Sequence, residues 1–197
     1  LPQKWLNRLV DPRPKLAGME LTNCCIMGVL NVTPDSFSDG GSFDDPASAV
    51  FQAENMLQNG ADIIDVGGES TRPGAKKISA ALEIKRTASV IRTICAKTKV
   101  AVSIDTRKAA VARAAVESGA ALVNDVSGLT FDPDLAPFCA KENLPVCVMH
   151  SQGLPETMQD NPLYDDVVLD VYDFLDDQIN RLNGQGIARN CIIADPG

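Results

Sequence analysis

Residues 100–128, VAVSIDTRKAAVARAAVESGAALVNDVSG, contain the pattern that decides the fold. A short apolar run ends at Asp105, a polar loop follows, and an alanine-rich stretch from 109 to 117 ends near Gly119. A second apolar run then leads to Asn124. Apolar strands that alternate with amphipathic helices are typical of a parallel sheet covered by helices.

The same alternation extends along the whole chain. The strand-like runs are CCIMGVLN (24–31), ADIIDVGG (61–68), VAVSIDT (100–106), ALVNDVSG (121–128), PVCVMH (145–150) and CIIADPG (191–197). Helices are predicted at 46–58, 79–97, 109–117, 133–141 and 163–183. Two Asp-Pro pairs, at 45–46 and 132–133, are typical of helix N-termini, and the glycines at 60, 119 and 184 are typical of helix ends.

A polar residue marks the end of every predicted strand: Asn31, Asp65, Asp105, Asn124 with Asp125, His150 and Asp195. Asp and Asn also begin turns and cap helices, so one such residue alone indicates little. In a TIM barrel, however, the C-terminal ends of all strands meet at one mouth, which holds the active site. No G-x-G-x-x-G follows the first run, which disfavours an open dinucleotide-binding sheet. We therefore predict an α/β fold, a (β/α)8 TIM barrel with about six of its eight units in this chain.

Residues 1–197 are predicted to form a single domain. Six units give about 33 residues each, and two more would bring the chain to about 260, near the usual size of this fold. A barrel cannot close with six strands, so we expect the sequence to be cut at the sixth βα loop, after Asp195.

Composition limits the function classes. With 18 basic and 26 acidic residues, the net charge of -8 disfavours nucleic acid and anionic membranes as partners. No apolar run approaches the roughly 18 residues of a membrane span, so a cytoplasmic protein is expected. Six cysteines without a C-x-x-C pair are interpreted as small core residues in a reducing compartment. The single histidine, His150, excludes a site built from several histidines.

Two loops carry candidate chemistry at the predicted mouth. NVTPDSFSDGGSF (31–43) is long and glycine-containing, and it holds Asp35 and Phe37. GGESTRPGAKK (67–77) offers the Thr71 hydroxyl and the Arg72 guanidinium, which suits an anion. Each could be an ordinary turn, but two such loops on adjacent strands favour a pair that closes over a ligand.

Six motifs in this order closely resemble the dihydropteroate synthase family: MGVLNVTPDSFSDGG, DVGGESTRPGA, SIDTRK, VNDVSG, MHSQGLPETMQ and IIADPG. The first two are long and specific, and the other four are persuasive as an ordered set. The resemblance implies a TIM barrel that joins 6-hydroxymethyl-7,8-dihydropterin pyrophosphate to p-aminobenzoate and releases pyrophosphate. It also implies Mg²⁺ as cofactor and a homodimer.

By motif, the resemblance assigns a role to each candidate residue. The pterin pocket has a floor of Asp105, Asn124 and Asp195 and apolar walls of Val126 and Met149. Asn31 is the implied metal ligand, and it shares the pyrophosphate with Thr71 and Arg72. Phe37, Thr71, Arg72 and Pro73 shape the p-aminobenzoate side. The implied catalytic residues are Asp105, Asp35 and Arg72, with the Asp105 carboxylate stabilising a cation on the pterin.

The sequence departs from the family pattern at two places. Nothing follows ADPG, so the lysine, the Ser-Arg-Lys stretch and the Arg-x-His that the family carries beyond it are absent here. Ser151 replaces an apolar residue of the family's MHMQG-like turn. Two alternatives remain, a non-catalytic pterin-binding module and a pterin-dependent methyltransferase domain. The TPDSF and STRPG loops favour the synthase, because both alternatives leave an anion site without a task.

Overall fold

The computed structural model describes residues 15–33, 46–70, 77–152 and 162–197. Within these ranges, six strands form one parallel sheet in chain order: β1 (Met27–Asn31), β2 (Ile63–Gly67), β3 (Ala101–Asp105), β4 (Leu122–Asp125), β5 (Val146–Met149) and β6 (Ile192–Asp195). Each strand pairs with its sequence neighbours, and β1 does not pair with β6. The predicted α/β fold is confirmed, as an open, six-stranded part of a barrel.

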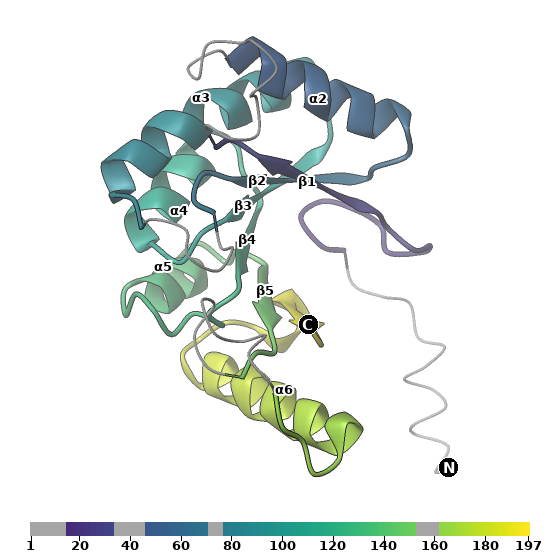
Figure 1. Cartoon of the computed structure of the whole chain (residues 1–197), viewed down its shortest axis with the longest axis vertical. Coiled ribbons are helices and arrows are strands. Elements are labelled where there is room, and N and C mark those ends of the chain that lie inside the picture. Colours follow the sequence, from purple (N-terminus) through teal and green to yellow (C-terminus); the bar gives the residue numbers. More distant parts are fainter. Residues whose placement is uncertain (1–14, 34–45, 71–76, 153–161) are drawn as a thin grey trace.

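Helices connect the strands and lie along one side of the curved sheet, while the segment 15–26 that precedes β1 lies on the other (Figure 1). The helices are α2 (Pro46–Gln58), α3 (Ala80–Lys97), α4 (Ala109–Glu117), α5 (Leu135–Lys141) and α6 (Val167–Gly184), and a short 3-10 turn, η2 (Arg189–Cys191), precedes β6. Because side chains alternate along a strand, each strand has one face toward the helices and one toward the interior of the curve.

The helix-facing side holds the main core. Leu30, Ile64 and Ile104 have no solvent exposure, and they pack against apolar residues of the helices. In α4, Val111, Ala112 and Ala115 are buried at helical spacing, whereas Arg113 and Glu117 are exposed. Burying one large aliphatic side chain contributes about 1.5–3 kcal/mol, so this layer holds the strands in place.

Residues 16–19 cover the interior side of the sheet near the N-terminal ends of β4 and β5. Leu16 and Met19 bond to each other through their backbones in a tight turn. Leu16 packs against Leu122 of β4 and Cys147 of β5, in a small cluster separate from the main core. The apolar contacts therefore close the N-terminal ends of the strands and leave the C-terminal ends to the polar residues.

Six of the ten predicted helix boundaries are confirmed; the starts of α5 and α6 are wrong by two and four residues, and the start of α3 and the end of α6 by one. α2 and α4 have the predicted bounds, and α3 begins one residue later because Ser79 caps it and accepts from the Leu82 amide at 3.3 Å. α5 begins at Leu135 instead of 133, because residues 133–134 form a turn in which the Asp132 carboxylate accepts from the Asp134 amide at 3.0 Å; its other oxygen accepts from the Ala109 amide at 2.8 Å.

At the other wrong boundary, α6 begins at Val167, where Asp166 accepts from the amides of Val168 and Leu169. Its end also differs from the prediction. Gly184 is the last helical residue, and Gly186 takes the left-handed conformation, with φ of 97°.

The cysteine interpretation is only partly correct. All six thiols are free, but only Cys139 and Cys147 are buried, and Cys24 and Cys25 precede β1 instead of lying in it. In the described part of the chain, no helix is long and apolar enough to cross a membrane.

Candidate functional site

Polar side chains gather on the interior face at the C-terminal ends of the first four strands. Pairing places Asn31, Gly67, Asp105 and Asn124 in one row across β1 to β4. Asp105 and Asn124 are partly exposed and Asn31 is exposed, so this row is open to solvent. The prediction that these side chains converge on one mouth is confirmed for Asn31, Asp105 and Asn124.

Two members of the predicted ring lie elsewhere. Asp65 is not at a strand tip: it lies two residues earlier in β2, and Gly67 takes the tip position. Asp125 lies on the helix-facing side, where it is fully buried and accepts from the Ser127 amide and hydroxyl and from the Leu129 amide. Asp125 therefore organises the turn after β4.

His150 also differs from the prediction. Its ring is buried and packs edge-on against Phe174 of α6, with 4.9 Å between the ring centroids, and it lies 5.8 Å from the ring of Tyr164. The imidazole therefore joins β5 to α6, and the histidine belongs to the packing of that contact.

Asp105 supplies the carboxyl group of this row. Burial raises its pKa to about 8, helped by the negative charges of Asp65, Asp125 and Glu83, while Arg107 lowers it. Neither of its carboxyl oxygens accepts a hydrogen bond from another residue in the described ranges. A desolvated acceptor surrounded by like charges favours a ligand that brings N–H donors or positive charge.

Beneath Asp105, a buried hydrogen-bond network spans three strands. The Asp65 carboxylate accepts from the Asn124 side-chain nitrogen at 2.9 Å and from the Ser103 hydroxyl. Asp65 and Ser103 are almost fully buried, and burial raises the Asp65 pKa against the lowering effect of these two hydrogen bonds. The network fixes the amide orientation of Asn124.

Gly67 leaves an open space between two polar groups. A Cβ atom at this position would lie 3.4 Å from the Asn31 Oδ1 and 3.4 Å from an Asp105 carboxyl oxygen. The absent side chain therefore keeps free a small, oxygen-lined gap between β1 and β3.

On β5 and β6, Met149 and Asp195 are paired and lie two residues beyond the pair Cys147 and Ile193 on the same face. Both are partly exposed, and the Asp195 carboxylate accepts from the Gly197 amide at 2.9 Å. Val126 follows β4 directly and is half-buried. These three residues extend the polar row toward the last strand.

The chain is similar to known proteins in sequence and in fold. The sequence model of the family described as pterin binding enzyme matches residues 27–197. This chain belongs to the pterin-binding enzyme family. It is 45% identical to a dihydropteroate synthase of Escherichia coli strain K12 over 179 residues, which are 91% of this chain and 63% of that protein.

Solved structures of the same family superpose closely. A Xanthomonas albilineans dihydropteroate synthase with 4-aminobenzoic acid matches with a TM-score of 0.85 and 40% identity, over 95% of this chain and 67% of that one. A Burkholderia cenocepacia dihydropteroate synthase with 7,8-dihydropteroate matches with a TM-score of 0.78 and 38% identity, over 91% and 60%. The chain thus spans about 60 to 63% of the length of the first curated relatives it matches.

Part of the predicted site lies outside the described residues of this chain. These residues are Asp35 and Phe37 of the first loop and Thr71, Arg72 and Pro73 of the second. Their roles remain predictions.

Sequence reasoning missed an ionic cluster at the base of the second loop. Glu69 accepts from the Ile78 amide at 2.8 Å, which joins the two ends of the segment that carries Thr71 and Arg72. Lys108 reaches Glu69 at 3.0 Å and the buried Glu83 at 2.6 Å. Burial tends to raise the Glu69 pKa, but the hydrogen bonds from Ile78, Lys108 and Arg107 lower it overall. The charged pair Arg107-Lys108, directly after SIDT, is the one signal that could have indicated this cluster.

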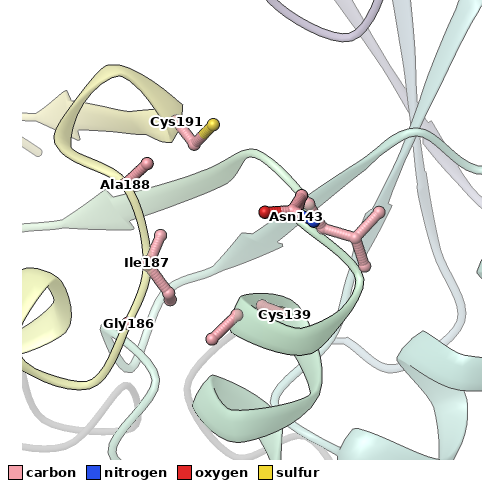
Figure 2. Close-up of a pocket in the computed structure, with 8 residues that line it drawn as sticks. Cys139, Asn143, Gly186, Ile187, Ala188 and Cys191 are labelled. Atoms are coloured by element: carbon pink, nitrogen blue, oxygen red, sulfur yellow. The ribbon is translucent and has the colours of Figure 1, made fainter.

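A pocket elsewhere in the molecule is too small for a substrate. It lies between α5 and the connection from α6 to β6, with Cys139, Asn143, Ile187 and Cys191 among its lining residues (Figure 2). Its volume of about 10 Å³ is about the smallest that can hold one water molecule. It is a packing gap, remote from the polar row.

The described residues contain no group of three or more His, Cys, Asp or Glu side chains that could hold a metal ion. Mg²⁺ needs fewer protein ligands, because it keeps several waters and takes substrate phosphate oxygens. The Asn31 carbonyl and the Asp105 carboxylate beside the Gly67 gap are the oxygen donors that fit it.

Proposed function

We propose that this protein is a dihydropteroate synthase. In this reaction the bond between the pterin methylene carbon and the pyrophosphate oxygen breaks, and a bond to the amine nitrogen of p-aminobenzoate forms, with loss of one amine proton. The observation that supports the proposal most is the row of Asn31, Asp105 and Asn124 in a chain of this family. The relatives named for this activity, and the structures named with 4-aminobenzoic acid and 7,8-dihydropteroate, support it further.

Asp105 supplies the electrostatic part of catalysis. When pyrophosphate leaves, positive charge develops on the pterin ring and methylene carbon. A carboxylate held in a desolvated site beneath the ring stabilises that charge without reorganisation. The raised pKa of Asp105 reflects the unfavourable energy of this charge in the free protein, and the cation relieves it.

Asn124 and Asp195 recognise the edge of the pterin. That edge alternates N–H donors with ring-nitrogen and carbonyl acceptors, which carboxylates and a carboxamide can bind with paired hydrogen bonds. Val126 and Met149, half-buried beside them, supply apolar contact with the flat ring faces.

The leaving group is bound at the other side of the row. Asn31 would hold Mg²⁺, which would supply positive charge to neutralise the pyrophosphate. Thr71 and Arg72 donate hydrogen bonds to the same group, and with Pro73 and Phe37 they enclose p-aminobenzoate. Asp35, on the first loop, is the third catalytic residue. Closure of the two loops excludes water from the pterin cation. The cluster of Glu69 and Lys108 supports the second loop at its base.

The same resemblance also implies a domain organisation, an oligomeric state and a location. We propose a single barrel domain, a homodimer and a cytoplasmic location. Sedimentation equilibrium of the purified natural protein tests the dimer.

The proposed activity is tested by assaying dihydropteroate formation in the full-length natural protein and its Asp105→Asn variant. The variant should bind a bare pterin measurably but lower turnover by two orders of magnitude or more, the scale seen when one preorganised electrostatic group is removed. Pterin binding without any turnover by the unmodified protein would point to a non-catalytic binding module.

A further inference from the structure

Asp65 has no part in the mechanism above, yet it is one of the most buried carboxyl groups of the interior face, with 2% exposure. It lies on β2 one layer beneath the polar row, paired with Ser103 of β3. A buried carboxylate is unfavourable unless donors satisfy it, and here two side chains do so. One of these donors belongs to the proposed ligand-binding residues.

The contact with Asn124 decides which end of that amide faces the ligand. A carboxylate can only accept hydrogen bonds, so the Asn124 Nδ2 must face Asp65, at 2.9 Å. The flipped amide would bring its Oδ1 against a carboxylate oxygen and leave both acceptors without a donor, which is unfavourable in a buried site. Because Asp65 lies below the row, the Oδ1 is turned away from it, toward the open strand ends.

Ser103 fixes Asp65 in turn. Its hydroxyl donates to the other carboxyl oxygen of Asp65, so the carboxylate is held at both oxygens and cannot rotate away from Asn124. The hydrogen bonds thus link Ser103 of β3, Asp65 of β2 and Asn124 of β4. They leave the Asn124 Oδ1 as one defined acceptor beside Asp105.

We propose that Asp65 is a positioning and specificity residue: by holding the Asn124 nitrogen, it makes the site present a carbonyl acceptor that selects a 2-amino-4-oxopyrimidine edge over a 2,4-dioxo edge. The inference rests on the proposed function. A pterin offers an amino donor at position 2, whereas the corresponding lumazine offers a carbonyl acceptor there. Two facing acceptors exclude the lumazine.

The test is the ratio of the dissociation constants of 6-hydroxymethyllumazine and 6-hydroxymethylpterin, measured by calorimetry on the full-length natural protein. The unmodified protein should prefer the pterin on the order of 100-fold, because a mismatch leaves buried polar groups unpaired. In Asp65→Asn the new amide can donate as well as accept, so Asn124 can flip. The ratio should then fall at least about tenfold.

Asp125→Asn is the matched control. Asp125 is equally buried and also raises the pKa of Asp105, but its hydrogen bonds go to Ser127 and Leu129, whereas the Asn124 side chain donates to Asp65. Its ratio should stay within about threefold of the unmodified protein, less than one hydrogen bond contributes. If both variants lose the preference equally, interior charge sets it, and the inference fails.

A double variant, Asp65→Asn with Asn124→Asp, exchanges the two groups. It keeps one amide, one carboxylate and the interior charge, so it is usable even if the single variant is too unstable to purify. It presents a carboxylate acceptor to the ligand and should recover the preference for the pterin. A double variant without that preference, or a single variant with the full preference, overturns the inference. An unmodified protein that binds neither pteridine refutes the proposed function instead.

Discussion

The buried carboxyl group of Asp105 lowers the stability of the folded protein while it serves the proposed function. Its carboxylate is desolvated and surrounded by Asp65, Asp125 and Glu83, with Arg107 as a partial counter-charge. The unfolded chain releases the Asp105 proton near its ordinary value of 3.8, whereas the folded protein holds it to about 8. A carboxyl group whose pKa rises on folding does not oppose folding at a pH at which both states are protonated. At higher pH it lowers the stability of the folded state.

The resulting prediction concerns stability against pH. The contribution of Asp105 is fully present below pH 3.8 and is lost progressively as pH rises to about 8. Asp105→Asn removes this loss, so the variant should be more stable than the unmodified full-length protein at pH 8 to 9, by at least about 1 kcal/mol. Below pH 4 the two proteins should unfold alike. Urea unfolding at both pH values measures the difference, and equal stability at pH 9 would contradict it.

At the scale of elements, the two glycines that end β2 have different tasks. Gly67 faces the polar row, where a Cβ would meet Asn31 and Asp105 at 3.4 Å. Gly68 faces α3, where a Cβ would lie 2.8 Å from the Thr87 methyl group and 3.3 Å from the Glu83 carbonyl oxygen. One glycine keeps space for a ligand, and the other lets the helix approach the strand.

Alanine at each position separates these tasks in the full-length natural protein. Gly68→Ala should destabilise the fold by about 1–3 kcal/mol, the usual cost of overpacking, because backbone and packed atoms must move. Gly67→Ala should leave unfolding nearly unchanged but weaken pterin binding at least about tenfold, because the methyl group fills the gap. Thermal unfolding and calorimetry on both variants measure the two effects. A reversed pattern would show that the faces of β2 are misassigned.

The helix boundaries differ in how far the sequence could predict them. α2 and α4 were found within their bounds because local signals, Pro46 at the start of one and Gly119 beyond the other, coincide with the tertiary structure. The start of α5 was misplaced because Asp132 holds a turn at 133–134 through the Asp134 amide and also bonds to the amide of Ala109, 23 residues away. Local patterns carry no information about such a partner.

Some residues of the candidate site could be predicted from the sequence, and others depend on contacts between distant parts of the chain. Asn31, Asp105 and Asn124 could be predicted because parallel strands bring their C-terminal ends together. Asp65 was placed at a tip because two glycines follow it, but β2 continues through Gly67. The contacts of Lys108 with Glu69 and Glu83, 39 and 25 residues away, depend on helix packing that only the folded chain defines.

At the scale of the whole molecule, the sheet has two open edges in the described part of the chain. β1 and β6 each have one neighbour, and Val29 of β1 is 55% exposed although it lies on the interior face. α6 exposes Val168, Leu169 and Tyr172 by 59 to 72%, so much of its apolar surface has no cover. Unpaired parallel edges and exposed apolar faces promote association.

We therefore predict that residues 1–197 expressed alone unfold over a broad temperature range, bind a hydrophobic dye and form no dihydropteroate. Weak pterin binding should survive, because Asp105, Asn124 and Asp195 are all present. Two further βα units, roughly 65 residues, taken from the Escherichia coli relative, would pair both edges and cover α6. That chimera should unfold cooperatively and exclude the dye, because closing the barrel buries the apolar surfaces that were exposed. Calorimetry and dye fluorescence on the two chains measure this, and a sharp, dye-free transition for residues 1–197 would show that the open six-stranded sheet is a stable fold in its own right.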